Sequence, residues 1–190
     1  FTVSTFSCVN NLLCLAVGIV AALLLDQFNQ RIEVPEDYTR EELRQDLLCY
    51  TSPVLKEDLV LTGDMTAELY ISSDAPDTDF VVRVTDVDEN GRSIKLADGL
   101  LSARYRNGFA RSEFLQEGEI VCLKIRTTKL SNCFRKGHRI RVTVTSSAKN
   151  FIFPNSNTRE GFASARTVVA HNRVYHGGLH ASRLTVRVEP

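Results

Sequence analysis

The sequence predicts an all-β protein built as an antiparallel sandwich or barrel, and three observations lead to this fold class. From Leu47 onward, short runs rich in β-branched residues alternate apolar and polar side chains with a period of two. Clusters of Gly, Pro, Asn, Asp and Ser separate these runs, which is typical of sandwiches and barrels. After Tyr50 no helical pattern interrupts the runs, which argues against a parallel α/β sheet.

The alternating runs give the predicted strands. Segment 138–147 is the clearest, because Ile140, Val142 and Val144 would point to one face and the residues between them to the other. The other predicted strands are 65–73, 80–87, 93–99, 100–108, 119–130, 166–176 and 182–190. We therefore assign residues 47–190 to one β-sandwich domain, which is long enough to bury a core.

The preceding segment, 31–46, is polar and acidic, and we interpret it as an ordered connector. Thr39 is followed three residues later by Glu42, the spacing of a capping box. A short helical turn is therefore expected to begin at this threonine.

Residues 1–30 form an apolar, helix-compatible segment of different composition. Leu12–Leu25 is a run of 14 apolar residues with one Gly, shorter than the roughly 20 residues that span a bilayer. Three interpretations stay open: a buried or interfacial helix, a membrane anchor, or an irregular chain end. Because position 1 is Phe and the only Met is Met65, we expect the chain to be a piece of a longer protein.

The formal net charge is 0, so no global charge draws the chain to nucleic acid or to anionic lipid. The charge is nevertheless uneven. Residues 1–100 hold 7 Lys+Arg and 18 Asp+Glu, whereas residues 101–190 hold 16 and 5. Since these charges alternate with apolar residues, we expect strands from the two halves to lie side by side and neutralise each other, with no nucleic-acid partner.

The number of cysteines is odd and no C-x-x-C motif occurs, so free thiols in a reducing compartment are expected. This predicts a cytoplasmic location, with a membrane tether through Leu12–Leu25 as the alternative. Apolar or strand-like neighbours predict that four of the five thiols pack in the core. The cysteines are Cys8, Cys14, Cys49, Cys122 and Cys133.

The segment "DVDENGRS" (86–93) has the acidic spacing of a calcium loop and also the composition of a hairpin tip. Calcium binding requires a Glu at position 12 and flanking helices, but position 12 is Ala97 and the flanks are strand-like. Asn90 and Gly91 both tolerate positive φ, so we predict a tight hairpin turn.

Motifs for catalysis or cofactor binding are absent from the sequence. It contains no G-x-S-x-G, no G-x-x-x-x-G-K-[ST] and no G-x-G-x-x-G. His171, His176 and His180 are closely spaced, but no H-E-x-x-H frames them, so a structural or surface role is expected. The sequence therefore assigns no catalytic, cofactor-binding or metal-binding residue.

Several segments in order resemble a known family. "ELYISSDAPDTDFVVRVTDVDENGRSIKLADG" is followed by "SNCFRKGHRIRVTVTSS", "NSNTREG" and "VYHGGLHASRLTVRV". From about Asp46 to Pro190 the chain is similar to the C-terminal, non-catalytic domain of X-Pro dipeptidyl-peptidases and of the related cocaine-esterase-like serine hydrolases.

The resemblance implies a jelly-roll β-sandwich of the galactose-binding-like type. In that family the domain packs on an α/β-hydrolase domain with a Ser-Asp-His triad, helps to wall the acyl or peptide pocket and contributes to subunit contacts. The hydrolase domain would precede residue 1, so no catalytic residue is carried over and the chain alone is expected to be inactive. A homo-oligomer is also implied.

A second hypothesis is a stand-alone module that binds carbohydrate or another ligand. The aromatic candidates for such a surface are Tyr50, Tyr70, Tyr105 and Phe109, which are scattered along the sequence. A membrane-tethered interaction domain that uses Leu12–Leu25 is a third hypothesis.

Some positions depart from the family pattern and others agree with it. Ala181 and Arg183 replace a Pro and a His in the tail, and the turn before "NSNT" is altered at 148, 149 and 152. Asp77 and Asp79 are expected to cap backbone N–H groups in a tight loop, with cation or sugar binding as the alternative. Asn132 is expected to fix the turn into strand 139–147.

Overall fold

The described residues form an antiparallel β-sandwich. The computed structural model describes residues 36–148 and 152–188. The apolar segment 1–30, Cys8, Cys14 and Lys149 therefore lie outside the described residues. No helix of the described part is long and apolar enough to cross a membrane.

The strands follow one another with three short 3₁₀ helices and no α-helix in the described ranges. The strands are β1 (Leu48–Thr51), β2 (Leu59–Gly63), β3 (Thr66–Ser73), β4 (Asp79–Val87), β5 (Ser93–Ser102), β6 (Val121–Arg126), β7 (Leu130–Phe134), β8 (Arg139–Thr145), β9 (Asn172–Gly177), β10 (His180–Ala181) and β11 (Arg183–Thr185). The 3₁₀ helices are η1 (Glu41–Leu43), η2 (Ala103–Tyr105) and η3 (Gly161–Ala163).

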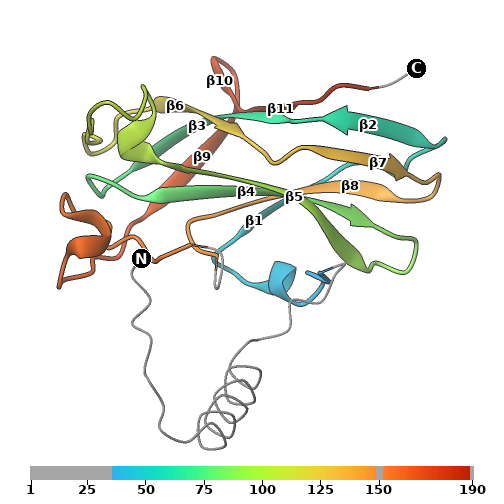
Figure 1. Ribbon diagram of the computed structural model, residues 1–190, viewed down its shortest axis with the longest axis horizontal. Coiled ribbons are helices and arrows are strands. Elements are labelled where there is room, and N and C mark those ends of the chain that lie inside the picture. Colours follow the sequence, from blue (N-terminus) through green and yellow to red (C-terminus); the bar gives the residue numbers. More distant parts are fainter. Residues whose placement is uncertain (1–35, 149–151, 189–190) are drawn as a thin grey trace, which may run out of the picture. The chain divides into compact units, whose positions relative to one another are not determined.

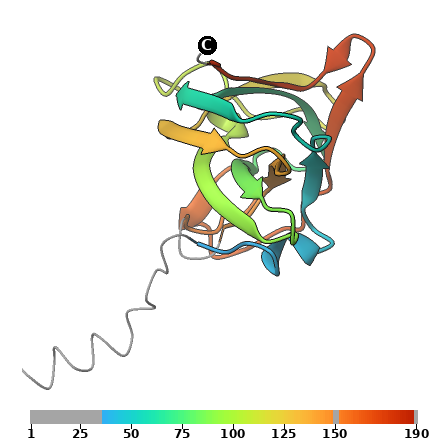
Figure 2. The ribbon, with the colours of Figure 1, turned by 90° about the vertical axis from the view of Figure 1, so that its right-hand side faces the viewer.

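Two main sheets enclose the core. One has the order β1-β8-β4-β5, and the other has the order β10-β9-β3-β11, with β6 also paired to β3. A ribbon of β2 and β7 continues between them (Figure 1). Figure 2 shows the strands curling around a central core. The predicted all-β sandwich is thus confirmed, while its jelly-roll connectivity stays a prediction.

The core is mainly aliphatic, with two buried aromatic rings, those of Phe80 and Phe134. β3, the central strand of its sheet, contributes three residues to the main cluster, and β4 and β6 contribute two each. The main buried cluster comprises Ala67, Leu69, Ile71, Phe80, Val82, Ala103, Leu115, Leu123, Ile125 and Val144. Burial of this apolar surface supplies the main driving force for folding.

β4 is buried on its outer face as well. Val81 and Thr85 on this face are fully buried, and Arg83 is 6% exposed. Arg83 Nε donates to Asp98 Oδ1 on β5 at 2.7 Å, and its guanidinium lies 3.8 Å from the centre of the Tyr38 ring. The connector therefore covers this face and contacts the buried charge.

Glu42 of η1 fastens the connector to the same face. Its carboxylate accepts hydrogen bonds from Ser93 Oγ at 2.8 Å and Thr85 Oγ1 at 3.1 Å, and it pairs with Arg141. The expected helical turn is present, but the predicted capping box is wrong. Glu42 points into the sheet, and Thr39 Oγ1 donates to Asp37 at 2.6 Å instead of capping η1.

The two halves of the chain neutralise each other, as their opposite charges predicted. Acidic residues from the first half pair with basic residues from the second across neighbouring elements. These pairs are Glu42–Arg141, Asp77–Arg104, Asp64–Arg126 and Glu68–Lys124.

Several predicted strand limits are wrong. Segment 100–108 is not a separate strand, because β5 continues to Ser102 and η2 follows. In segment 166–176 the strand begins only at Asn172. β1 and β2, short strands near the start of the sandwich, were not predicted as separate strands.

Two side-chain predictions are also wrong. Asn132 lies within β7 opposite Leu61, and the turn before β8 is closed by backbone hydrogen bonds instead. Cys49 and Cys133 are exposed and Cys122 is half-buried, so none of these three thiols belongs to the core. All three are free, as expected.

Gly99 closes one side of the sandwich by bringing β5 close to β6. A Cβ atom at this position would lie 2.8 Å from the carbonyl oxygen of Arg126 and 2.9 Å from Ile125 Cγ2. The backbone of Thr128 also donates to the Asp98 carbonyl at 2.8 Å, so the approach is fixed. Only a residue without a side chain fits here.

We expect Gly99→Ala to lower the free energy of unfolding by about 1–3 kcal/mol, the usual cost of overpacking. Urea denaturation checks this. Gly177→Ala is the matched control, because a Cβ there meets nothing within 4 Å, and its midpoint should stay near the wild-type value. Equal midpoints for the two variants would contradict the close approach of β5 and β6.

Candidate functional site

Three loops meet at one end of the sandwich, which we call the loop end. They are the β3–β4 loop (74–78), the segment after β5 that contains η2, and residues 152–171 before β9 (Figure 1, left). Backbone hydrogen bonds join the first two, from Leu115 to the Pro76 carbonyl at 2.8 Å and from Ala103 to Thr78 at 2.9 Å.

Asp77 and Arg104 form the centre of the loop end. Asp77 is fully buried, and its two carboxylate oxygens accept from the backbone N–H of Arg104 at 2.9 Å and from Arg104 Nε at 2.8 Å. The rest of the guanidinium donates to the carbonyls of Thr158 at 2.9 Å and Arg159 at 3.1 Å. One ion pair therefore holds all three loops.

Asn155 completes this cluster. Its amide nitrogen donates to Asp77 and to Asp79 at 2.8 Å each. Asp77 does cap a backbone N–H as expected, but the N–H belongs to η2 rather than to its own loop. Since protein donors occupy both carboxylates and both residues are buried, the arrangement favours a structural role over cation or sugar binding.

The turn at 86–93 is a hairpin, as predicted. The N–H of Gly91, at φ 85°, donates to the Asp88 carbonyl at 3.0 Å, and Asp88 N–H donates to the Arg92 carbonyl at 2.9 Å. Asp88 Oδ1 accepts from the backbone of Asn90 and Arg92, while Asp86 contacts His138 Nδ1 at 2.9 Å. Within residues 86–93 only Gly91 has a positive φ, so Asn90 does not adopt the left-handed conformation that the sequence allowed for it.

The three histidines of the second half do not converge. His171 contacts Asp74 through its ring Nδ1 at 2.7 Å, His176 meets the ring of Tyr50 edge to face, and His180 lies against Tyr70. No group of three or more His, Cys, Asp or Glu that could hold a metal occurs within residues 36–148 and 152–188.

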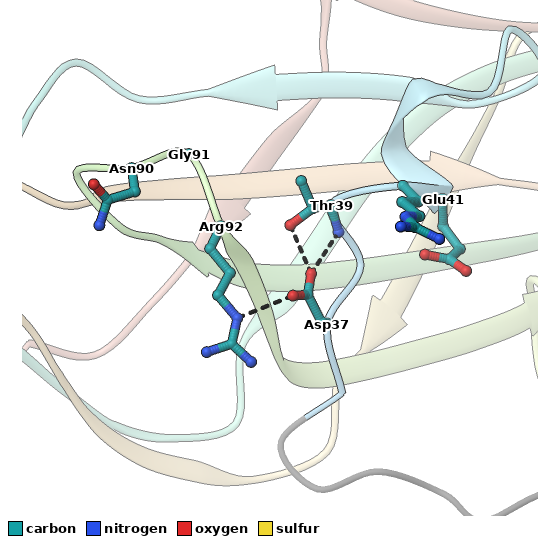
Figure 3. Close-up of a pocket in the computed structure, with 7 residues that line it drawn as sticks. Asp37, Thr39, Glu41, Asn90, Gly91 and Arg92 are labelled. Carbon is teal, nitrogen blue, oxygen red and sulfur yellow. Dashed lines mark hydrogen bonds and ion pairs between the residues drawn. The ribbon is translucent and has the colours of Figure 1, made fainter.

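A shallow hollow lies where the connector meets the 86–93 hairpin (Figure 3). It is lined by Asp37, Thr39, Arg40, Glu41, Asn90, Gly91 and Arg92. Asp37 accepts from Thr39 Oγ1 at 2.6 Å, from the Thr39 backbone N–H at 3.0 Å and from Arg92 Nε at 2.9 Å. These bonds, those from Thr39 first, lower the pKa of Asp37 from 3.8 to about 2.

The carboxylate of Asp37 at the centre of this hollow already accepts hydrogen bonds from Thr39 and Arg92. These bonds fasten the connector to the hairpin.

The aromatic candidates also form separate pairs rather than one platform. Tyr50 lies against His176, Tyr70 against His180 and Tyr105 against Phe109, with centroid separations of 6.1, 5.3 and 5.4 Å.

Comparison with known proteins gives a specific result. Residues 11–185 match the family described as X-Pro dipeptidyl-peptidase C-terminal non-catalytic domain. A cocaine esterase of Rhodococcus sp. (strain MB1 Bresler) is 36% identical over 159 residues, which cover 81% of this chain and 27% of the esterase.

Solved structures show the same fold. An aminopeptidase from the marine sediment archaeon Thaumarchaeota archaeon superposes with a TM-score of 0.78 and 26% identity, over 82% of this chain and 28% of the aminopeptidase. An alpha-amino acid ester hydrolase superposes with a TM-score of 0.73 and 24% identity, over 77% of this chain and 26% of the hydrolase. The chain thus spans about a quarter of the length of these proteins.

We expect Asp77→Ala to lower the free energy of unfolding by about 3 kcal/mol or more, because it leaves the Arg104 guanidinium, 11% exposed, without its carboxylate. Thermal and urea denaturation measure this loss. Asp46→Ala removes the exposed pair with Arg44 and should change the free energy by less than about 1 kcal/mol. A loss no larger than that of the control would contradict the central role of Asp77.

Asp37 should make stability sensitive to acid. Because its pKa falls on folding, its contribution is complete above the unfolded value of 3.8 and is lost as the pH falls through about 2. Urea midpoints between pH 4 and pH 2 should therefore fall less steeply in Asp37→Asn than in the wild type. Glu57→Gln, which alters an exposed carboxylate, is the control, and parallel pH profiles of wild type and Asp37→Asn would refute the assignment.

Proposed function

Because this chain belongs to the family of X-Pro dipeptidyl-peptidase C-terminal non-catalytic domains, we propose that it is the accessory β-sandwich of a serine peptidase or esterase whose catalytic domain has the α/β-hydrolase fold. The observation that carries this proposal is the share of each relative's length that this domain covers. The domain accounts for about a quarter of each relative, and those relatives are named as hydrolases or peptidases.

The arrangement of polar groups supports an accessory role. Arg104 and Asn155 both donate to Asp77 and so stabilise loops, and Asp77 and Asn155 come from segments that carry the family resemblance. In the described part no histidine is hydrogen-bonded to a Ser or Cys side chain, the contact that nucleophilic catalysis needs. A rigid scaffold rather than a reaction centre accounts for these contacts.

We propose further that the domain helps to wall the substrate pocket and stabilises the assembly, including a homo-oligomer. Exposed apolar side chains support a contact role, since they are suited to burial against another surface. Phe109, Phe153 and Val169, for example, are 79%, 87% and 76% exposed. A cytoplasmic location agrees with the free thiols of Cys49, Cys122 and Cys133.

Purified alone, the 190-residue chain should not hydrolyse p-nitrophenyl esters or X-Pro anilides above the rate without protein. Added to the Rhodococcus esterase from which the matching segment has been removed, it should bind and raise the remaining esterase activity. Hydrolysis by the chain alone that is lost in His138→Ala or His171→Ala would contradict the proposal. So would failure of the wild-type chain to bind the shortened esterase.

A further inference from the structure

β1 carries apolar side chains that face the core but remain exposed. Leu48 lies opposite Val144, and Tyr50 lies opposite Val142, so all four point to the same face of the sheet. Val144 belongs to the core and Val142 packs against it. Leu48 and Tyr50 are nevertheless 43% and 38% exposed, because β1 is the last strand of its sheet in the described ranges.

On the facing side of the second sheet lies β9, whose outer edge is paired with the two-residue β10 at His176 and Gly177. Val174 on β9 lies opposite the fully buried Ile71 and packs against the core, so His176, two residues later, points the same way. His176 is exposed, and its ring meets Tyr50 across the gap between the sheets at 6.1 Å. We call the surface formed by Leu48, Tyr50, Val174 and His176 the open flank.

The opposite side of the sandwich is closed. There β5 meets β6 at Gly99, and the connector adds backbone hydrogen bonds to the β5 edge, from Lys95 to Glu36 at 3.0 Å and from Tyr38 to Ser93 at 2.8 Å. β1, in contrast, pairs only with β8 among the described strands. The open flank thus combines inward-facing apolar side chains with an unpaired strand edge, which folded proteins otherwise cover.

We propose that the open flank is the surface on which the α/β-hydrolase domain docks, an inference that rests on the proposed function. The flank contains no Asp, Glu, Lys or Arg, so it fits a largely apolar partner that can hydrogen-bond to Tyr50, His176 and the β1 backbone. The hydrolase domain is the fitting occupant. In each relative nearly three quarters of the chain lies outside this domain, and a covalent link gives such a partner a high effective concentration.

Binding of the full 190-residue chain to the shortened Rhodococcus esterase tests this surface. We expect Leu48→Asp and Tyr50→Arg each to weaken binding by about thirtyfold or more, as central interface residues do. Val60→Asp is the matched control. Val60 has a similar exposure of 39%, but it precedes the buried Leu61 on β2 and therefore points outward. Its affinity should equal that of the wild type.

Hydrogen exchange on the wild-type chain gives a second readout that needs no variant. Amides of β1, residues 48–51, should exchange more slowly once the shortened esterase is bound, while those of β2 should not change. Equal affinity of Leu48→Asp, Tyr50→Arg and wild type, without protection of β1, would overturn the docking surface and leave the accessory function intact. No binding of the wild-type chain would overturn both.

A second copy of the chain is the competing occupant. If the wild type forms a dimer that Leu48→Asp and Tyr50→Arg dissociate while both still bind the shortened esterase normally, the open flank is a self-association surface and the proposal is wrong. Light scattering coupled to size-exclusion chromatography distinguishes these outcomes. If the wild type is a monomer and its binding to the shortened esterase depends on Leu48 and Tyr50, the docking proposal is supported.

Discussion

Burial of β4 on both faces is the constraint on which the rest of this domain depends. Its inner face supplies Phe80 and Val82 to the core, and its outer face places Arg83 away from water. A buried guanidinium is costly unless it is paired and hydrogen-bonded. Asp98 provides the charge and Tyr38 covers the group, so the connector must lie ordered on the sheet for β4 to be stable.

At the loop end, too, a buried charge is paired and hydrogen-bonded, but by different residues. Asp77 is buried because it joins an ion pair to Arg104 and a hydrogen bond to Asn155, and these three residues come from segments far apart in the chain. Asp77 and Asn155 belong to two of the segments that carry the family resemblance, and removal of either leaves buried partners without their hydrogen bonds.

The alternation of side chains was sufficient to predict β3 and β8, since period two directly reports a strand with distinct faces, whereas β4, buried on both faces, was predicted from its run of β-branched residues. It could not predict that Cys49 and Cys133 are exposed, because alternation does not tell a central strand from an edge strand. Glu42 was expected to bond locally to Thr39, but Ser93, Thr85 and Arg141 bind it instead. Such long-range partners, like those of Asp77, have no signature within a short stretch of sequence.

The docked connector changes where this domain can be separated from its neighbours. The alternating sequence pattern begins at Leu47, yet a chain that started there would lack two residues of the connector. Tyr38 covers Arg83, and Glu42 accepts a hydrogen bond from Thr85. The compact unit instead runs from Pro35 to Pro190. A truncation that starts near residue 36 would therefore keep these contacts, whereas one that starts near residue 47 would remove them.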